Sequence, residues 1–274
     1  MKRPYNTMNA MAKFTENTQK IAVLLLLIAL TSLAISCRKG ATATGETTAA
    51  RPAGEAIAQA DQLFGGRADL VKVRQGVIVL RQAQAEDQGN YELAWRLAKF
   101  NYYLGNHTPN SDEGSKAFHD GIEAGKLAVK SQDGKPEGHF WLGANYGGSA
   151  KTSILAGLSE FDDIKREMET VIKLDEHYQD ASAYMALGQL YLEAPGMLGG
   201  DTQKAIQYLE KGLKLGPDNA LMRAQLATAY VEVHRNDEAR KQIDAVLAMK
   251  PAAGYEPEYN DAVAEVKTLQ EKIK

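Results

Sequence analysis

Residues 220–253 read ALMRAQLATAYVEVHRNDEARKQIDAVLAMKPAA, and this stretch decides the fold. Apolar residues recur in it at helical spacing on both sides of a polar turn, which predicts two consecutive helices. An earlier stretch follows the same template. The matching positions are Leu187, Gly188, Tyr191, Ala205, Leu209 and Pro217 in the first copy, and Leu226, Ala227, Tyr230, Ala239, Ile243 and Pro251 in the second. Alanine and proline are 12 residues apart in both copies, so the chain contains an internal repeat.

The order L-G-x2-Y, A-x3-F and P is the signature of the tetratricopeptide repeat, a helix–turn–helix unit of about 34 residues. A third copy of its first half occurs at Leu142, Gly143 and Tyr146. The small residues allow two helices to cross closely, and the prolines end the second helix. Arrays of such units act through the concave surface of their stacked helices rather than through built-in chemistry. The repeat therefore favours a binding or scaffolding protein.

The same periodicity predicts an all-α protein, a tetratricopeptide-type solenoid of about eleven helices over residues 55–274. Glycines at positions 105 and 147–148 are interpreted as helix ends, and a short extra element is expected at 150–156. Residues 194–200, APGMLGG, are an inserted loop, and residues 258–274 are a capping helix. The expected helices are 55–64, 69–84, 90–104, 111–129, 136–146, 158–174, 180–193, 202–215, 219–234, 236–248 and 258–274.

Residues 1–36 resemble a secretory signal peptide, with a basic start and an apolar core at 21–35. That core is shorter than the roughly 20 residues that span a bilayer. It leads into Ala34-Ile35-Ser36-Cys37, which resembles a bacterial lipobox and predicts that Cys37 is lipidated. The alternative is ordinary cleavage that leaves Cys37, the only cysteine, as an unpaired thiol.

Residues 37–54 are rich in threonine, alanine and glycine and lack apolar periodicity, so they are predicted to be a flexible, lipid-anchored tether. Arg38 follows the cysteine where an aspartate would favour retention in the inner membrane. We therefore expect the protein at the periplasmic face of the outer membrane, held to the membrane by its lipid.

No catalytic, metal or cofactor site is predicted. The five histidines are scattered, and no glycine-rich phosphate-binding motif is present. We interpret His139 as a packing residue, and Asp162, Asp163, Glu167 and Glu169 as a solvated helix face. The charge is balanced, with 32 basic and 35 acidic residues, which does not favour nucleic acid as a partner. These observations indicate that the protein is not an enzyme.

The candidate site is the inner face of the repeats, where positions 2, 5, 9 and 12 of each first helix line the concave side. This lining is predicted to be largely apolar, as expected for a groove that binds a ligand or a partner. The alternative is that these side chains are buried against neighbouring units. The predicted groove residues are Trp95, Lys99, Tyr102, Phe140, Ala144, Met185, Gln189, Leu192, Leu221 and Thr228, with Ala224 and Val231 at the same repeat positions.

Four stretches in order resemble the T component associated with TRAP transporters, a family of periplasmic tetratricopeptide lipoproteins in bacteria. They are HFWLGANYG at 139–147, Leu174-Asp175 with Tyr178, LGQLY at 187–191, and PGMLGGD at 195–201. The resemblance covers about residues 83–248, and the inserted PGMLGGD stretch is its most distinctive part because ordinary repeats lack it.

The resemblance implies a helical lipoprotein that faces the periplasm, has no recognised enzymatic activity and serves a transporter of organic acids and related small molecules. The implied partner is the substrate-binding protein of that transporter, and the groove would bind a small hydrophobic ligand. The alternative function is a general envelope scaffold that assembles other proteins through the same surface. The sequence leaves the ligand and the oligomeric state open, a homo-oligomer included.

Overall fold

The computed structural model describes residues 52–152 and 154–273, and these all belong to one compact unit, Thr48–Lys274. The predicted signal peptide, Cys37 and nearly all of the tether lie outside the described residues. Eleven α-helices and one short 3-10 helix make up the described part. They are α2 (Ala53–Gly65), α3 (Leu70–Glu86), α4 (Tyr91–His107), α5 (Ser111–Ser131), α6 (Pro136–Ala150), α7 (Ile154–Leu174), α8 (Tyr178–Glu193), η1 (Gly196–Leu198), α9 (Thr202–Leu215), α10 (Ala220–Glu232), α11 (Asn236–Ala248) and α12 (Glu256–Lys272).

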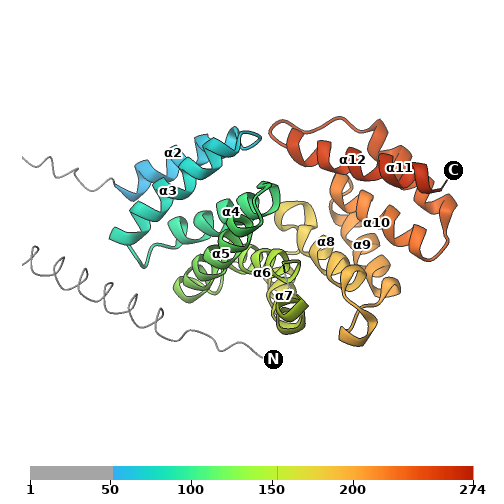
Figure 1. Cartoon of the computed structure of the whole chain (residues 1–274), viewed down its shortest axis with the longest axis horizontal. Helices are drawn as coiled ribbons and strands as arrows, with labels where there is room; N and C mark the ends of the chain where they lie inside the picture. The colour runs from blue at the N-terminus through green and yellow to red at the C-terminus, as the bar shows by residue number, and fades with distance from the viewer. Residues whose placement is uncertain (1–51, 153, 274) are drawn as a thin grey trace, which may run out of the picture. The chain divides into compact units, whose positions relative to one another are not determined.

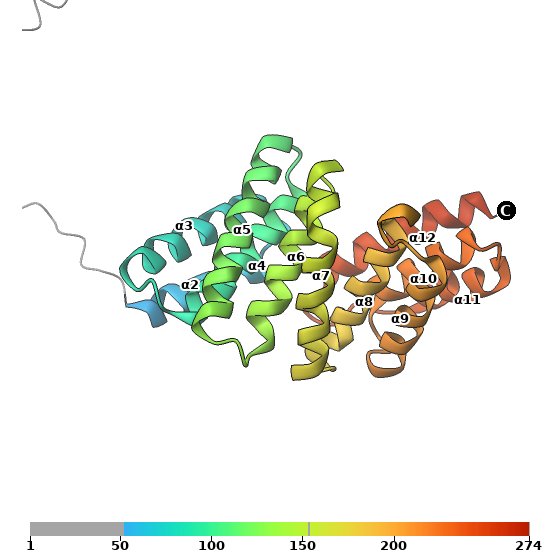
Figure 2. The same cartoon turned by 90° about the horizontal axis from the view of Figure 1, so that it is seen from below.

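Consecutive helices form five pairs, α2/α3 to α10/α11, and α12 follows them. Figure 1 shows the pairs succeeding one another in chain order, and Figure 2 shows α4 to α7 lying side by side. Each pair packs on the next, so most of the apolar side chains of the helices are covered by a neighbour. None of the described helices has the length and apolar character needed to cross a membrane.

Close helix crossings depend on glycines, both at the repeat position Gly188 and at Gly125. A Cβ atom on Gly188 of α8 would lie 2.5 Å from Cγ of Leu209 on α9. A Cβ on Gly125 of α5 would lie 2.9 Å from Cα of Leu142 on α6. Such distances leave no room for a Cβ atom. Because glycine has none, the two helices can approach closely at these positions.

Two helix ends predicted from glycines are wrong. The helix α4 continues through Gly105 to His107, and α6 continues through Gly147 and Gly148 to Ala150. The physical reason is the ring of Phe118 on α5, because a Cβ on Gly105 or Gly148 would lie 2.5 Å or 2.1 Å from its Cε1 atom. These two glycines make room for an aromatic ring between helices and do not end them.

The separate short element expected at residues 150–156 is also absent from the described structure. The helix α6 extends to Ala150 and α7 already begins at Ile154. The two longer helices therefore take up most of that stretch. In α8, regular helix begins after Ala181, because Gln179, Asp180 and Ala181 have left-handed backbone angles.

The last helix covers the end of the array, as the sequence predicted. Ala262, Val266 and Leu269 of α12 are buried in the second hydrophobic core cluster. They pack against α10 and α11, whose apolar sides would otherwise face solvent. A preceding loop positions α12, and Gly254 in that loop has a positive φ of 84°.

Candidate functional site

A pocket of about 490 Å³ lies among α4, α6, α7, α8 and the loop that follows α8. Its volume is in the range of about 300–1,000 Å³ that small-molecule sites occupy. The residues that line it are Tyr102, Asn106, Phe140, Gly143, Ala144, Gly147, Gly148, Ala150, Lys151, Thr152, Phe161, Ile164, Met168, Met185, Ala186, Gln189, Leu190, Glu193, Ala194, Pro195 and Leu198.

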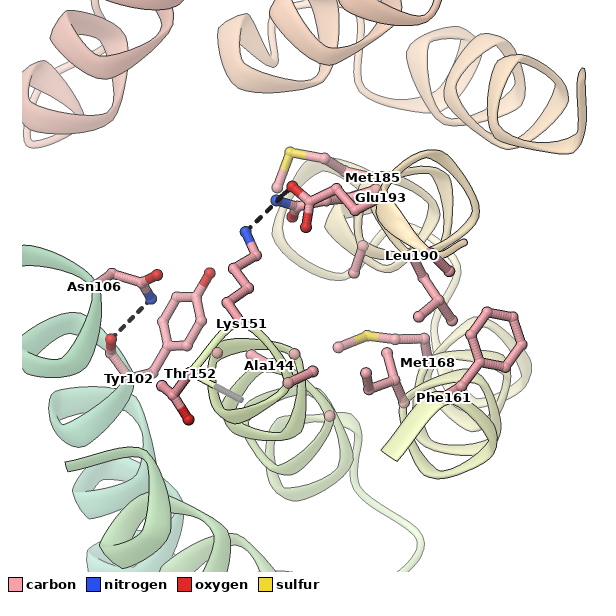
Figure 3. Close-up of a pocket in the computed structure, with 18 of the residues that line it drawn as sticks. Tyr102, Asn106, Ala144, Lys151, Thr152, Phe161, Met168, Met185, Leu190 and Glu193 are labelled. Atoms are coloured by element: carbon pink, nitrogen blue, oxygen red, sulfur yellow. Dashed lines mark hydrogen bonds and ion pairs between the residues drawn. The ribbon is translucent and has the colours of Figure 1, made fainter. Parts of the chain in front are cut away.

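Apolar side chains form most of the pocket wall, and small residues on α6 open the space between them. Figure 3 shows Phe161, Met168 and Leu190 gathered on one side, with Tyr102 and Asn106 across from them. Met168 is fully buried, so it forms a fixed part of the wall. A wall of this composition suits an apolar ligand. Removal of apolar surface from water contributes roughly 25 cal/mol of favourable free energy for each Å² that is buried.

Polar groups gather at one side of the pocket. Nζ of Lys151 lies 3.3 Å from Oε1 of Glu193, and Nε2 of Gln189 donates a hydrogen bond of 2.9 Å to the same oxygen. Both charged side chains are 48% exposed, so this ion pair is solvated and weak. Outside the pocket lining, burial raises the pKa of Glu265 on α12, and Oγ1 of Thr228 donates to that carboxylate at 2.8 Å.

The inserted loop builds the remaining wall, and two glycines fix its path. A Cβ atom on Gly200 would lie 1.8 Å from the carbonyl oxygen of Ala194, and Gly199 has a φ of 100° facing the ring of Phe161. The amide of Leu198 donates to the carbonyl of Pro195 at 2.8 Å. This tight turn places Pro195 and Leu198 on the pocket.

The structure brings together half of the predicted groove residues. Those on the pocket are Tyr102, Phe140, Ala144, Met185 and Gln189. The other five predicted positions lie elsewhere in the array. They are Trp95, Lys99, Leu192, Leu221 and Thr228.

Most of these remaining positions already have neighbours within the protein. Nε1 of Trp95 donates to Oε2 of Glu92 at 2.9 Å. Leu192 and Leu221 pack against the second core cluster, as the alternative of burial among neighbouring units anticipated. Nζ of Lys99 lies 3.9 Å from the ring centroid of Phe64 and 5.8 Å from that of Trp141.

Sequence reasoning missed the pocket residues of α7, the end of α6 and the inserted loop. Phe161, Ile164 and Met168 belong to the second helix of a unit. The prediction placed only first helices on the concave side and second helices on the outer side. Lys151 was missed because α6 was expected to end before it. The sequence did identify the inserted loop as distinctive. Because inserted loops often carry functional residues, that insertion could have indicated that the loop lines the pocket.

His139 is a packing residue, as its sequence position predicted, but its partner was not expected. Nδ1 of His139 lies 2.6 Å from Oε2 of Glu167, and Nε2 lies 2.8 Å from the carbonyl oxygen of Asp133. Glu167 is only 6% exposed, so its prediction as part of a solvated face is wrong. The contact with His139 therefore holds this carboxylate in the protein interior.

Across the described residues, no group of three or more His, Cys, Asp or Glu side chains could hold a metal ion.

A solved structure supports the repeat interpretation of this fold. A thermophilic TPR protein from Thermus thermophilus aligns with a TM-score of 0.60 and 19% identity, covering 80% of this chain and 100% of its own. A MamA protein structure aligns more loosely, with a TM-score of 0.45, 18% identity, and coverage of 80% and 96%. Comparison with curated protein sequences gives no significant match. The prediction of an all-α tetratricopeptide-type fold is thus confirmed.

A family model gives the more specific result. The model described as "TRAP transporter T-component" matches residues 120–265, more than half of the 274 residues. The matched region contains α6 to α11, the inserted loop and all of the pocket except Tyr102 and Asn106. The description is that of a component of a transport system, and the comparisons indicate no enzymatic family. The chain therefore belongs to the TRAP transporter T-component family.

Proposed function

We propose that this protein is an accessory of TRAP-type solute uptake that binds a small apolar ligand in the pocket between α4 and the loop after α8. The observation that carries this proposal is the pocket of about 490 Å³, walled by Phe140, Phe161, Met168 and Leu190. A largely apolar concavity with a few polar groups at one side has the composition of a small-molecule site. The family relationship supports a role in transport.

The proposed protein partner is the periplasmic substrate-binding protein of the TRAP transporter. Family membership implies interaction with TRAP components, and a repeat array offers an extended surface for docking. The proposed location is the periplasmic face of the outer membrane, through a lipid on Cys37. Burial of lipid chains contributes about 0.8 kcal/mol per CH₂, so a multiply acylated cysteine would anchor the protein stably.

Native mass spectrometry of the purified full-length protein tests the ligand. We expect an apolar small molecule to remain bound to the wild type and to be lost from Ala144→Phe, because a ring at position 144 fills the pocket. Ala58→Phe is the matched control, since Ala58 is exposed on α2 and far from the pocket residues in sequence. No bound molecule on either protein, together with no binding of added apolar compounds, would contradict the proposal.

The partner is tested separately with the purified substrate-binding protein encoded nearest to this chain. We expect the two proteins to co-elute in size-exclusion chromatography. If they do not, and other envelope proteins are captured instead, the function is that of a general envelope scaffold. For the anchor, we expect wild type in the membrane fraction and Cys37→Ala in the soluble fraction. Equal distribution of the two would rule out lipidation at Cys37.

A further inference from the structure

The solvent-facing side of α3 carries no charge, unlike that of other second helices in the array. Its exposed positions recur at helical spacing along one side of the helix. We call these positions the α3 stripe, and they are Val71, Gln75, Ile78, Gln82 and Ala85. The corresponding exposed stripes of α5 and α11 are charged, with Lys116, Glu123 and Lys130 on α5 and Asp237 and Lys241 on α11. The first helix pair therefore presents a surface of a different kind.

Two large aliphatic side chains stand in the α3 stripe. Val71 is 57% exposed and Ile78 is 56% exposed. Within residues 52–152 and 159–273, no other large aliphatic side chain on an α-helix is as exposed. The opposite side of α3 packs on α2 and α4 and buries Val73, Val77 and Leu80. Because apolar surface in water is unfavourable, a surface that covered Val71 and Ile78 would be favoured.

Cations border the α3 stripe on both edges. Lys72 is exposed on one edge. Arg74 and Arg81 lie on the other edge, where their side chains remain 41% and 54% exposed although each pairs with a carboxylate of α5 at 2.7 Å. Within α3 itself, the only acidic residue is Glu86, at its end. A surface that carries negative charge would therefore complement the rim of this stripe.

The proposed lipid anchor joins the domain at this same helix pair. Fifteen positions separate Cys37 from Pro52, and a fully extended chain of that length spans at most about 50 Å. Figures 1 and 2 show the start of α2 beside the end of α3. A lipid on Cys37 would thus keep α3 within reach of a bilayer. The intervening segment has three basic residues and one acidic residue, which are Arg38, Lys39, Arg51 and Glu46.

We propose that the α3 stripe docks on the bilayer that holds the lipid anchor, with Val71 and Ile78 in the head-group region and the bordering cations beside anionic lipid phosphates. This inference rests on the proposed anchor at Cys37 and adds the face of the domain that meets the membrane. A surface helix binds a membrane through buried apolar side chains and through attraction of its cations to anionic lipids, and α3 offers both. No residue of α2 or α3 lines the pocket, so docking leaves the pocket free.

A fluorescent label on the α3 stripe tests this inference in the full-length lipoprotein, reconstituted into vesicles that contain phosphatidylglycerol. Gln75→Cys, labelled with the dye NBD, places the dye between Val71 and Ile78. Gln207→Cys is the matched control, because Gln207 is exposed on α9. We expect spin-labelled lipids to quench the dye at position 75 and to leave the dye at position 207 unquenched. Val71→Gln combined with Ile78→Gln should abolish the quenching at position 75, and vesicles of phosphatidylcholine alone should reduce it.

Equal quenching at positions 75 and 207, or none at position 75 while the protein stays with the vesicles, would overturn the docking of α3 and leave the anchor standing. A change in emission at position 75 that requires an added periplasmic protein and no lipid would assign the stripe to a protein partner instead. The wild type tests the anchor separately, because its only cysteine reacts with the dye only if Cys37 is not acylated. Labelling of the wild type, with the protein outside the vesicle fraction, would overturn the anchor and this inference together.

Discussion

Arg67 and Glu258 form an ion pair between the two ends of the repeat array, across 191 positions of sequence. Arg67 lies between α2 and α3, and Glu258 lies on α12. Nε and one terminal nitrogen of the guanidinium donate to the two oxygens of this carboxylate, and the same terminal nitrogen also donates to the carbonyl oxygen of Gly254. The first helix pair and the last helix are thus fastened together by one side chain.

Breaking the ion pair of Arg67 with Glu258 should destabilise the protein. The Arg67 side chain is only 6% exposed, so its buried charge would be left without a carboxylate partner. We expect Glu258→Gln to lower the free energy of unfolding by about 2–4 kcal/mol. Urea denaturation measures the change. Asp237→Asn, which removes an exposed pair with Arg240, is the control and should have little effect. Equal losses for the two variants would mean that this ion pair does not hold in solution.

Helix crossing at Gly188 should tolerate no side chain. A Cβ atom there would lie 2.5 Å from Cγ of Leu209, so Gly188→Ala should lower the unfolding free energy by about 1–3 kcal/mol. Gly147→Ala, also inside a helix but with no atom within 4 Å of the new Cβ, should raise stability by up to about 1 kcal/mol. Thermal unfolding followed by circular dichroism compares them. Stabilisation by both substitutions would argue against a close crossing at Gly188.

Stability should fall with rising pH through the buried pair of His139 and Glu167. The hydrogen bond to Glu167 raises the pKa of His139, burial opposes this, and the bond to the Asp133 carbonyl adds to it. The stability that the charged histidine contributes is therefore fully present below its unfolded pKa, about 6.5, and is lost as pH rises through the folded pKa.

Urea denaturation between pH 6 and pH 9 measures this effect. We expect the wild type to lose stability over that range and His139→Gln to show a flatter profile. His119→Gln is the control, because His119 is exposed, and it should keep the wild-type slope. Parallel profiles for the wild type and His139→Gln would assign the pH dependence to other groups.

Two glycines of the inserted loop should respond differently to alanine. A Cβ on Gly200 would meet the carbonyl of Ala194 at 1.8 Å, so Gly200→Ala should displace Pro195 and Leu198 from the pocket. We expect weaker binding of an added apolar probe, 1-decanol, by at least tenfold, measured by isothermal titration calorimetry. Gly196→Ala in the same loop has open space around its Cβ and should bind as the wild type does. Unchanged binding to Gly200→Ala would exclude the loop from the site.

Local sequence features predicted most helices and failed at particular glycines. Asn90 begins α4 as expected, with its side-chain oxygen accepting from the amide of Leu93, because a cap depends only on residues close in sequence. Gly105 and Gly148 have the same residue type as helix-ending glycines, yet they serve the ring of Phe118 on another helix. A sequence pattern does not distinguish these two uses of glycine.

The candidate site was predicted in part for the same reason. Tyr102, Phe140 and Met185 follow from repeat positions on successive first helices. Phe161 and Leu198 do not, because they come from a second helix and from an inserted loop whose path depends on contacts with distant residues. Glu167 was placed on a solvated face by its local charge pattern, and only its pairing with His139 reveals its burial.

The sequence by itself determined the helical repeat, because helix periodicity, caps and the small residues at helix crossings act over one or two turns. It also carried the features that relate the chain to its family, including the inserted loop. Only the tertiary structure decided which helices enclose the pocket and that Arg67 joins the ends of the array. These outcomes depend on the accumulated rotation of successive units, to which every crossing contributes, and no single stretch of sequence encodes that sum.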